Sequence, residues 1–199
     1  MVKAILFDMN GVLIDSERLN RTAWEELFKE YKLGFSLNLY ESQIDGKSTK
    51  EVAEEYGIKD KEKFVERKDE IWFDLYEQQG IEVFDDVVSN LQRLKQKGWL
   101  LGVTSSSRKA DFILKDLHLY EFFDVIVNSR LLQRGKPFPD IYIEAMRQLN
   151  VEPNETIVIE DSDAGIKAAT MAHTTCFKIQ RCEKSNIMSA NCIKSLDEI

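Results

Sequence analysis

A short stretch near the N-terminus, Lys3–Asp15 (KAILFDMNGVLID), constrains the fold of this chain more than any other part of it. Ala4–Phe7 is a brief run of apolar residues, which is typical of a strand buried on both faces of a parallel sheet. Asp8 follows the run directly, and Met9–Gly11 interrupts the pattern as a tight turn does. Since open α/β sheets bind ligands at the carboxyl ends of their strands, Asp8 is a candidate ligand-binding carboxylate. The same residue would equally suit a turn or a helix cap, and this stretch alone leaves both interpretations open.

Strand patterns and helix patterns alternate through most of the remaining chain. Short apolar runs predict strands at 99–103, 123–127, 156–159 and 174–179, with a short edge strand at 191–194. Amphipathic patterns between them predict helices at 86–97, 109–117, 141–149 and 165–171. This alternation predicts an α/β fold, with a doubly wound parallel sheet and helices on both of its faces.

One segment, residues 16–81, breaks the alternation. Its apolar residues recur at three- and four-residue spacings and it shows no strand pattern, so helices are predicted at 16–31, 48–56 and 61–79. Gly34 is expected to end the first of them. Because this segment interrupts the chain just after its first strand, we expect a helical cap domain (16–81) inserted into a Rossmann-like core made of 1–15 and 82–199.

The composition limits what the chain can bind. The net charge of -8, from 35 acidic and 27 basic residues, argues against a nucleic-acid partner, which would require a basic face. No apolar run approaches the roughly 20 residues of a membrane span, and the N-terminus does not resemble a signal peptide. The three cysteines form no CxxC pair and suit reduced thiols. We therefore expect a cytoplasmic protein with no membrane partner, and a monomer, because no long apolar surface stripe is left over.

The carboxyl ends of the predicted strands collect oxygen-bearing side chains and one lysine: Asp8 and Asn10, then Thr104–Ser107, then Lys136, then Glu160 and Asp161. Several carboxylates in one cleft repel one another unless a cation joins them. Ligands without His or Cys select a hard ion such as Mg²⁺, which keeps waters and shares its site with a phosphate. Ser105 and Lys136 supply the donor and the positive charge that a phosphate requires. A carboxylate that faces a metal-bound phosphate can act as a nucleophile and form an aspartyl-phosphate.

These residues give the chain a resemblance to the haloacid dehalogenase-like hydrolases, in the branch that holds β-phosphoglucomutase and small-molecule phosphatases. The four motifs of that family occur in order, each at a predicted strand end or in the loop that follows: Asp8–Gly11 in FDMNGVLIDSE, Ser105 in GVTSSSR, Lys136 in GKPFPDIY, and Glu160 with Asp161 in VIEDSDAGI. The resemblance covers nearly the whole chain and includes the helical insertion after the first motif.

The resemblance implies a nucleophile and a metal site. Asp8 would attack the phosphorus of a small phosphorylated metabolite. Mg²⁺ would bind Asp8, the backbone carbonyl of Asn10, and Asp161. Glu160 would act on the ion directly or through a water.

The resemblance also implies a phosphate site. Ser105 and Lys136 would hold the phosphoryl oxygens, and Lys136 would also neutralise the nucleophile. The backbone N–H groups of Met9–Gly11 would add donors to the same oxygens. Ser106 and Arg108 are further candidates beside Ser105, although Arg108 suits a solvent-facing helix start equally well.

Asn10 departs from the family pattern, in which phosphotransferases carry an Asp two residues after the nucleophile. An amide cannot exchange a proton at neutral pH, so general acid–base catalysis, commonly worth about 10²–10⁴-fold, is lost at this position. Three explanations compete: an engineered Asp→Asn replacement, a natural protein that is a weak enzyme or a binding module, and a reaction that needs no such acid, as in dehalogenases. We favour the first, because every other motif is intact and suits a phosphate.

The predicted cap departs from the mutase pattern as well. Asn20 stands where β-phosphoglucomutase carries a His, and no Arg follows Lys47-Ser48. We therefore predict a phosphatase whose cap closes over the site, with hinges near Asp15-Ser16 and 81–83. The alternatives are a β-phosphoglucomutase-like phosphomutase and a non-catalytic phosphometabolite-binding protein.

Overall fold

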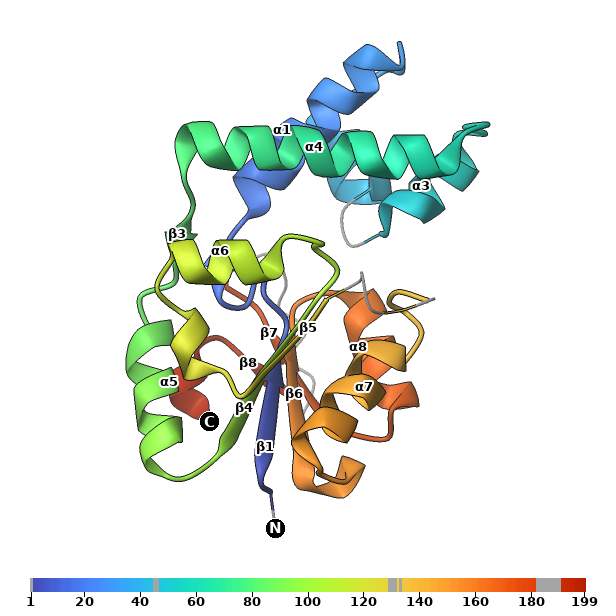
Figure 1. Cartoon of the computed structure of the whole chain (residues 1–199). Coiled ribbons are helices and arrows are strands. Elements are labelled where there is room, and N and C mark those ends of the chain that lie inside the picture. The colour runs from blue at the N-terminus through green and yellow to red at the C-terminus, as the bar shows by residue number, and fades with distance from the viewer. Residues whose placement is uncertain (1, 45–46, 129–131, 133, 182–190) are drawn as a thin grey trace. The chain divides into compact units, whose positions relative to one another are not determined.

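The computed structural model describes residues 2–44, 47–128, 132, 134–181 and 191–199. The chain forms two compact units (Figure 1). Met1–Ile14 and Val83–Ile199 make up an α/β unit, and Asp15–Glu82 makes up a helical unit. Two short strands, β2 (Ile14–Asp15) and β3 (Glu82–Val83), pair with each other where the chain passes between the units. None of the helices among the described residues has the length and apolar character needed to span a bilayer.

The α/β unit is built on a six-stranded sheet in the order β5-β4-β1-β6-β7-β8. Every neighbouring pair is parallel. The strands are β1 (Ala4–Phe7), β4 (Leu100–Ser105), β5 (Val125–Asn128), β6 (Thr156–Glu160), β7 (Thr175–Ile179) and β8 (Cys192–Ile193). All the predicted strands are present, and β4 runs two residues further than its apolar pattern indicated.

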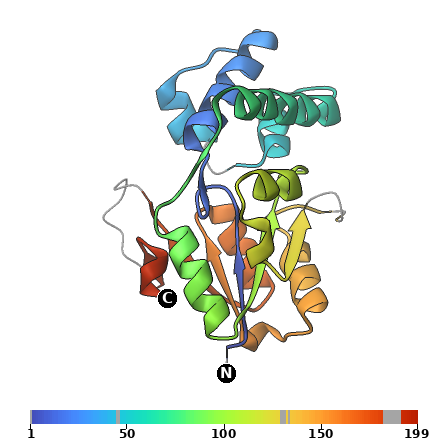
Figure 2. The same ribbon diagram turned by 60° about the vertical axis from the view of Figure 1, so that its left-hand side comes forward.

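Helices cover both faces of this sheet, as the doubly wound prediction requires. They are α5 (Val87–Gln96), α6 (Ala110–Asp116), α7 (Asp140–Leu149) and α8 (Asp163–Met171), with single 3₁₀ turns at Tyr120–Phe122, Pro153–Glu155 and Leu196–Glu198. Helix α7 packs against β5, β4 and β1, and α8 packs against β6 and β7. Figure 2 shows α5 on the opposite side of the sheet from α7. The α/β fold class is therefore confirmed.

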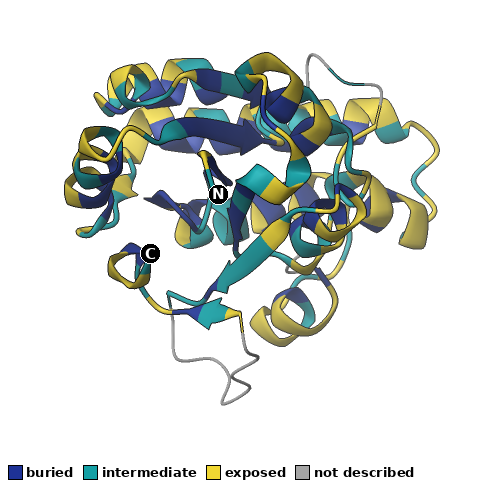
Figure 3. Ribbon diagram, turned by 90° about the horizontal axis from the view of Figure 1, so that it is seen from below, coloured by how far each residue is buried: buried dark blue, intermediate teal, exposed yellow. Residues whose placement is uncertain are grey.

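Strand β1 is central because its side chains are apolar on both faces. All four of its residues are completely buried, and Figure 3 shows dark-blue strand segments in the interior of the α/β unit, with exposed residues on the helices around them. Ala4 and Leu6 belong to a core cluster that includes Tyr142, Ala145 and Ala168 of α7 and α8. A strand covered on both faces has this continuous apolar pattern rather than an alternating one.

The register of the sheet brings the sequence motifs together. Phe7 pairs with Val103 of β4 and with Ile159 of β6. The residue after Phe7 therefore lies level with the last residues of both neighbouring strands. Three motifs that are far apart in the sequence thus meet at one edge of the sheet.

The helical unit contains α1 (Glu17–Glu30), α2 (Leu37–Leu39), a π-helical turn (Tyr40–Ile44), α3 (Thr49–Glu55) and α4 (Lys61–Gln79). Aromatic rings fill its interior, with Trp24 against Phe28 (5.8 Å between centroids) and Tyr31 against Phe64 (4.8 Å). A capping box between Ser48 and Glu51 begins α3.

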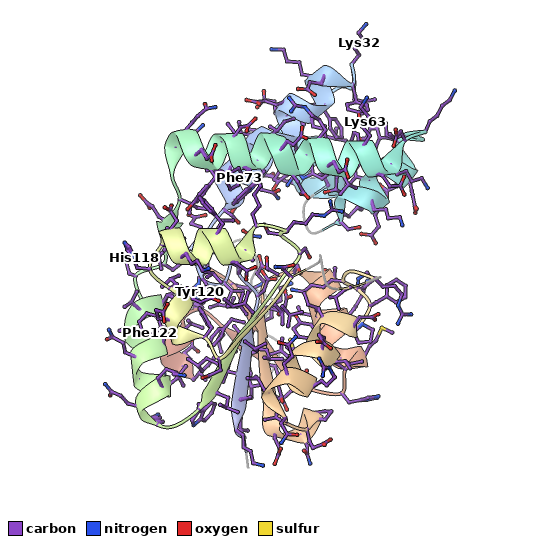
Figure 4. All side chains as sticks on the ribbon, viewed as in Figure 1. Lys32, Lys63, Phe73, His118, Tyr120 and Phe122 are labelled. Carbon is purple, nitrogen blue, oxygen red and sulfur yellow. The ribbon has the colours of Figure 1, made fainter. Side chains whose placement is uncertain are left out.

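One sequence expectation for this unit was wrong, and one helical segment was missed. Helix α1 ends at Glu30, and the left-handed residue that follows its end is Lys32 (φ 55°), labelled in Figure 4, rather than Gly34. The helical segment 37–44 was not predicted, because a three-residue helix followed by a π-helical turn is too short for its apolar pattern to distinguish it from a loop. Its start is set by Ser36, whose side chain accepts a hydrogen bond from the Leu39 N–H (3.2 Å).

Candidate active site

Asp8 directly follows β1, which places it at the carboxyl end of a central strand of the sheet. Its backbone N–H donates to the Ile159 carbonyl (2.9 Å), which continues the pairing with β6. The residue is 8% exposed, and its Oδ1 accepts a hydrogen bond from Lys136 Nζ at 2.5 Å. Burial raises the pKa of Asp8 to about 7, against the opposing effect of Lys136, and the charge of Glu160 contributes to the rise. Asp8 is therefore a buried carboxylate that titrates near neutrality.

The turn after Asp8 is closed by backbone hydrogen bonds. Gly11 donates to the Ile14 carbonyl (2.9 Å), and the Met9 carbonyl accepts from Leu13 (2.9 Å) and from Ile14 (3.1 Å). Gly11 has a φ of +72°, and a Cβ at this position would lie 2.0 Å from Asp161 Oδ2. Position 11 therefore requires glycine, both for its conformation and for the close approach of Asp161.

Asn10 carries the one fully buried side-chain oxygen among the described residues that has no hydrogen-bond partner. Its Oδ1 is buried and accepts no hydrogen bond. A buried acceptor of this kind marks a place where a donor or a cation can bind. Met9, by contrast, is completely buried in the core, so only its backbone faces the turn.

Ser105 ends β4 and is completely buried. Its Oγ accepts a hydrogen bond from the Ser107 N–H (3.1 Å), so the hydroxyl hydrogen remains able to donate elsewhere. Ser106 and Arg108 are exposed. The structure therefore places Ser105 at the sheet edge with Asp8, while Ser106 and Arg108 lie on the surface beside it.

Lys136 joins two carboxylates. Its Nζ donates to Asp8 Oδ1 and to Glu160 Oε1, both at 2.5 Å, and to the Thr104 carbonyl at 3.3 Å. Although burial alone would lower the pKa of Lys136, the charges of Asp8 and Glu160 raise it well above its ordinary value. The lysine is therefore a permanent positive charge beside Asp8.

Glu160 ends β6 and is completely buried. Its Oε1 accepts from Lys136 and from the Tyr142 hydroxyl (2.6 Å), and its Oε2 accepts from the N–H groups of Asp161 and Ser162 and from the Ser162 hydroxyl. Burial alone would raise the pKa of Glu160, but Lys136 and these hydrogen bonds lower it. Glu160 is therefore ionised and fully hydrogen-bonded.

Asp161 has the opposite electrostatic surroundings. Burial and the negative charges of Asp8 and Glu160 raise its pKa well above the ordinary value. Lys136 is one cation among three acids, so negative charge is in excess here.

This excess of charge suits a hard cation. Among the described residues, no three His, Cys, Asp or Glu side chains converge to hold a metal by themselves. Mg²⁺ commonly takes only one or two carboxylates and completes its shell with waters and a phosphate. Asp8, Asp161 and the turn at Asn10 fit such an ion.

Some groups at this edge were not predicted from the sequence. Tyr142 of α7 and Ser162, the N-cap of α8, both bind Glu160. A Cβ on Gly165 would lie 1.9 Å from the Glu160 carboxylate, so this glycine makes room for the buried acid. Each belongs to an ordinary helix pattern in the sequence, and the G in DSDAGI is the only signal that a close approach occurs there.

The fold and the cluster at its sheet edge define a class. An aspartate after the central strand, a serine after the next strand, a buried lysine and an acidic pair on a parallel sheet are the arrangement of the haloacid dehalogenase-like hydrolases. Residues 5–179 match that family. The chain belongs to the haloacid dehalogenase-like hydrolases.

Individual relatives and solved structures show which kinds of protein in this family the chain is similar to. The chain is 32% identical over 181 residues to validoxylamine A 7'-phosphate phosphatase of Streptomyces hygroscopicus subsp. limoneus, covering 88% of this chain and 84% of that one. It is 30% identical over 182 residues to β-phosphoglucomutase of Bacillus subtilis (86% and 80%). The crystal structure of an Asp→Asn mutant of CbbY from Rhodobacter sphaeroides, in complex with xylulose-(1,5)bisphosphate, superimposes with a TM-score of 0.81 at 25% identity (100% and 96%). The relatives thus include a phosphatase and a phosphomutase that act on small phosphorylated molecules.

Proposed function

We propose that this chain is a Mg²⁺-dependent phosphohydrolase of a small phosphorylated metabolite, slowed by Asn10. The observation that carries the proposal is the contact between Asp8 Oδ1 and Lys136 Nζ at the end of the central strand. A carboxylate beside a buried cation, at the edge where a parallel sheet binds its ligands, is suited to attack an electrophilic phosphorus. The bound Mg²⁺ would supply positive charge for the phosphoryl oxygens and for Asp8.

The reaction would proceed in two displacements. An oxygen of Asp8 forms a bond to phosphorus while the ester oxygen leaves with the bond's electron pair and takes up a proton. Water then attacks the phosphorus of the aspartyl-phosphate, releases inorganic phosphate and restores Asp8. Lys136 and Ser105 would stabilise the phosphoryl oxygens in both steps.

Asn10 bears on both proton transfers. Its amide can neither protonate the leaving oxygen nor remove a proton from water, so each step depends on solvent. Whether the asparagine is natural or introduced, the expected result is the same: a chain that binds its substrate and turns it over slowly.

The test compares the chain with its Asn10→Asp variant on a panel of sugar phosphates and small-acid phosphates, with Mg²⁺ present. We expect phosphate release to increase by about 10²–10⁴-fold in the variant. Adding Asp8→Ala to Asn10→Asp should abolish the activity, and dephosphorylation that continues undiminished would refute the mechanism.

Asn10 also favours a second candidate, a non-catalytic phosphometabolite-binding protein. The Asp→Asn mutant of CbbY holds a sugar bisphosphate, so an amide substitution in this family is compatible with binding. Binding without turnover in both forms of the chain would support this candidate. An isomerised product would support a phosphomutase instead. Against a phosphomutase, Asn20 stands where β-phosphoglucomutase carries a His, and its side chain is hydrogen-bonded to Lys68 and Tyr40.

A further inference from the structure

The carboxylate of Glu160 has no free position for a metal ion. Five donors reach it: Lys136 Nζ and the Tyr142 hydroxyl on Oε1, and two backbone N–H groups with the Ser162 hydroxyl on Oε2. A carboxylate offers about four lone-pair sites. Because five donors already exceed these sites, a direct bond from Glu160 to a cation would require at least two of the donors to leave.

The surroundings also hold Glu160 in this orientation. The residue is completely buried, and its carboxylate lies against the first turn of α8, where a Cβ on Gly165 would approach within 1.9 Å. Ser162 both caps α8, accepting from the Gly165 N–H (3.1 Å), and donates to Glu160. A shift of Glu160 would disturb the start of that helix.

The Asp161 carboxylate lies against a different part of the site from that of Glu160. Its Oδ2 is close to the backbone of Gly11, in the turn that follows Asp8. Among the described residues, Asp8, Glu160 and Asp161 do not converge as a metal-binding triad. The two neighbouring acids at the end of β6 therefore face different groups.

Tyr142 and Lys136 both donate hydrogen bonds to the same oxygen of Glu160. The Tyr142 hydroxyl donates to Glu160 Oε1 at 2.6 Å, and Lys136 Nζ donates to the same atom at 2.5 Å while lying 5.3 Å from the centre of the Tyr142 ring. Because the hydroxyl occupies one side of this oxygen, the ammonium group is confined to the side that also reaches Asp8.

We propose that Glu160 is not a metal ligand, and that Glu160 and Tyr142 are positioning residues that hold Lys136 against Asp8 and the phosphoryl group. Asp8 and Asp161 then supply the carboxylates for the cation. This inference rests on the proposed function, because it divides the roles within the same site. Removing the Tyr142 hydroxyl changes no charge, but it frees one side of Oε1 and lets Lys136 turn away from Asp8.

The test is calorimetric and needs no turnover. Mg²⁺ alone, and then inorganic phosphate at saturating Mg²⁺, are titrated into the unsubstituted chain and into Tyr142→Phe, Glu160→Gln and Asp161→Asn. Tyr120→Phe is the matched control, since Tyr120 (labelled in Figure 4) belongs to the same unit and its ring also lies near a lysine, Lys115 Nζ at 4.6 Å. Thermal unfolding of each variant verifies that it is folded.

We expect Tyr142→Phe to keep its Mg²⁺ affinity within about threefold and to lose about tenfold in phosphate affinity, in line with the loss of one hydrogen bond to a charged group. Glu160→Gln keeps the shape of the side chain and remains as a test if Tyr142→Phe does not fold. It should lose less than about tenfold in Mg²⁺ affinity. Asp161→Asn should lose about a hundredfold. Tyr120→Phe should change neither affinity.

Two results would overturn the inference alone: a loss in Mg²⁺ affinity for Glu160→Gln as large as that for Asp161→Asn, or unchanged phosphate affinity in a folded Tyr142→Phe. An unsubstituted chain that binds neither Mg²⁺ nor phosphate would refute the inference and the proposed function together. An Asn10→Asp variant that binds both ligands without releasing phosphate would refute only the proposed hydrolysis.

Discussion

At the scale of single residues, both the backbone conformation at Gly11 and its contact with the candidate site limit which residue can occupy this position. The residue combines a left-handed φ with an approach to Asp161 that leaves no room for a side chain. The sequence predicted the turn because Met9–Gly11 interrupts the apolar strand pattern, but the contact with Asp161 depends on how β1 and β6 pair.

We predict that Gly11→Ala is severely destabilising. Gly98→Ala is the matched control, since Gly98 has a similar φ (+79°) in the same unit, but a Cβ there would meet no described neighbouring atom within 4 Å. The control should cost about 1–2 kcal/mol for its left-handed conformation, and Gly11→Ala should cost at least about 2 kcal/mol more because of the clash. Urea unfolding measures both, and equal losses would contradict the close contact.

The titration of Asp8 gives a prediction with a definite sign. Its pKa in the folded chain, about 7, is above the 3.8 of an unperturbed Asp. Between these values the folded protein holds a proton that the unfolded chain has released, so stability present at low pH is lost as the pH rises toward 7.

Without Mg²⁺, the unsubstituted chain should therefore lose stability relative to Asp8→Asn between pH 5 and pH 7.5, by at least about 1 kcal/mol. Denaturant unfolding in the presence of a chelator measures the difference at each pH. Parallel pH profiles for the two chains would contradict a raised pKa for Asp8.

At the scale of elements, an ion pair and the hydrogen bonds around it connect four segments of the α/β unit. Arg181 Nη1 donates to both carboxylate oxygens of Asp86 (2.7 and 2.6 Å), and Nη2 donates to the Val12 carbonyl (2.6 Å). Asp86 also accepts from the Leu196 N–H (2.7 Å) and the Ser195 hydroxyl (2.8 Å). The start of α5 and the C-terminal residues therefore meet at the Asp86 carboxylate, and Arg181, just after β7, joins them to the turn after Asp8.

We predict that Arg181→Met destabilises the chain by about 3 kcal/mol, because it leaves Asp86 largely buried without a counter-charge. Arg147→Met, which breaks the pair between the exposed Arg147 and Glu144 on α7, should cost less than about 1 kcal/mol. Chemical denaturation distinguishes the two, and similar losses for both variants would contradict the importance of burial.

Helix ends show where sequence patterns are weakest. Lys32, His118, Asn150 and His173 adopt φ values between 53° and 59° at the ends of α1, α6, α7 and α8. Glycine is the usual signal for this conformation, so the pattern placed the end of α1 at Gly34. Residues other than glycine can adopt this left-handed conformation at a modest cost in free energy when packing on either side determines the direction of the chain.

At the scale of the whole molecule, all the groups proposed to bind Mg²⁺ and phosphate belong to the α/β unit. Ligand bound only to the folded state stabilises it by about 2.7 kcal/mol at 100 times the dissociation constant. We predict that Mg²⁺ with inorganic phosphate slows amide hydrogen exchange more strongly in β1, β4 and β6 than in α1, α3 and α4. Equal protection of both units would contradict a phosphate site confined to the α/β unit.

The sequence by itself determined the alternation of strands and helices, the helical character of 16–81 and the identity of the motif residues. These features are local, because the burial of a strand or a helix face imposes its period directly on the chain. For the same reason Asp8, Ser105, Lys136, Glu160 and Asp161 could be assigned to strand ends and loops before any contact between them was known.

The tertiary structure alone decided which atoms of those residues touch. Lys136 is 128 positions from Asp8, and its choice of Oδ1 and of Glu160 Oε1 follows from strand register and from the packing of α7. The hydrogen bond from Tyr142 to Glu160 likewise left no periodic trace in the sequence, because a bond between separate elements depends on where folding places them rather than on the residues beside them.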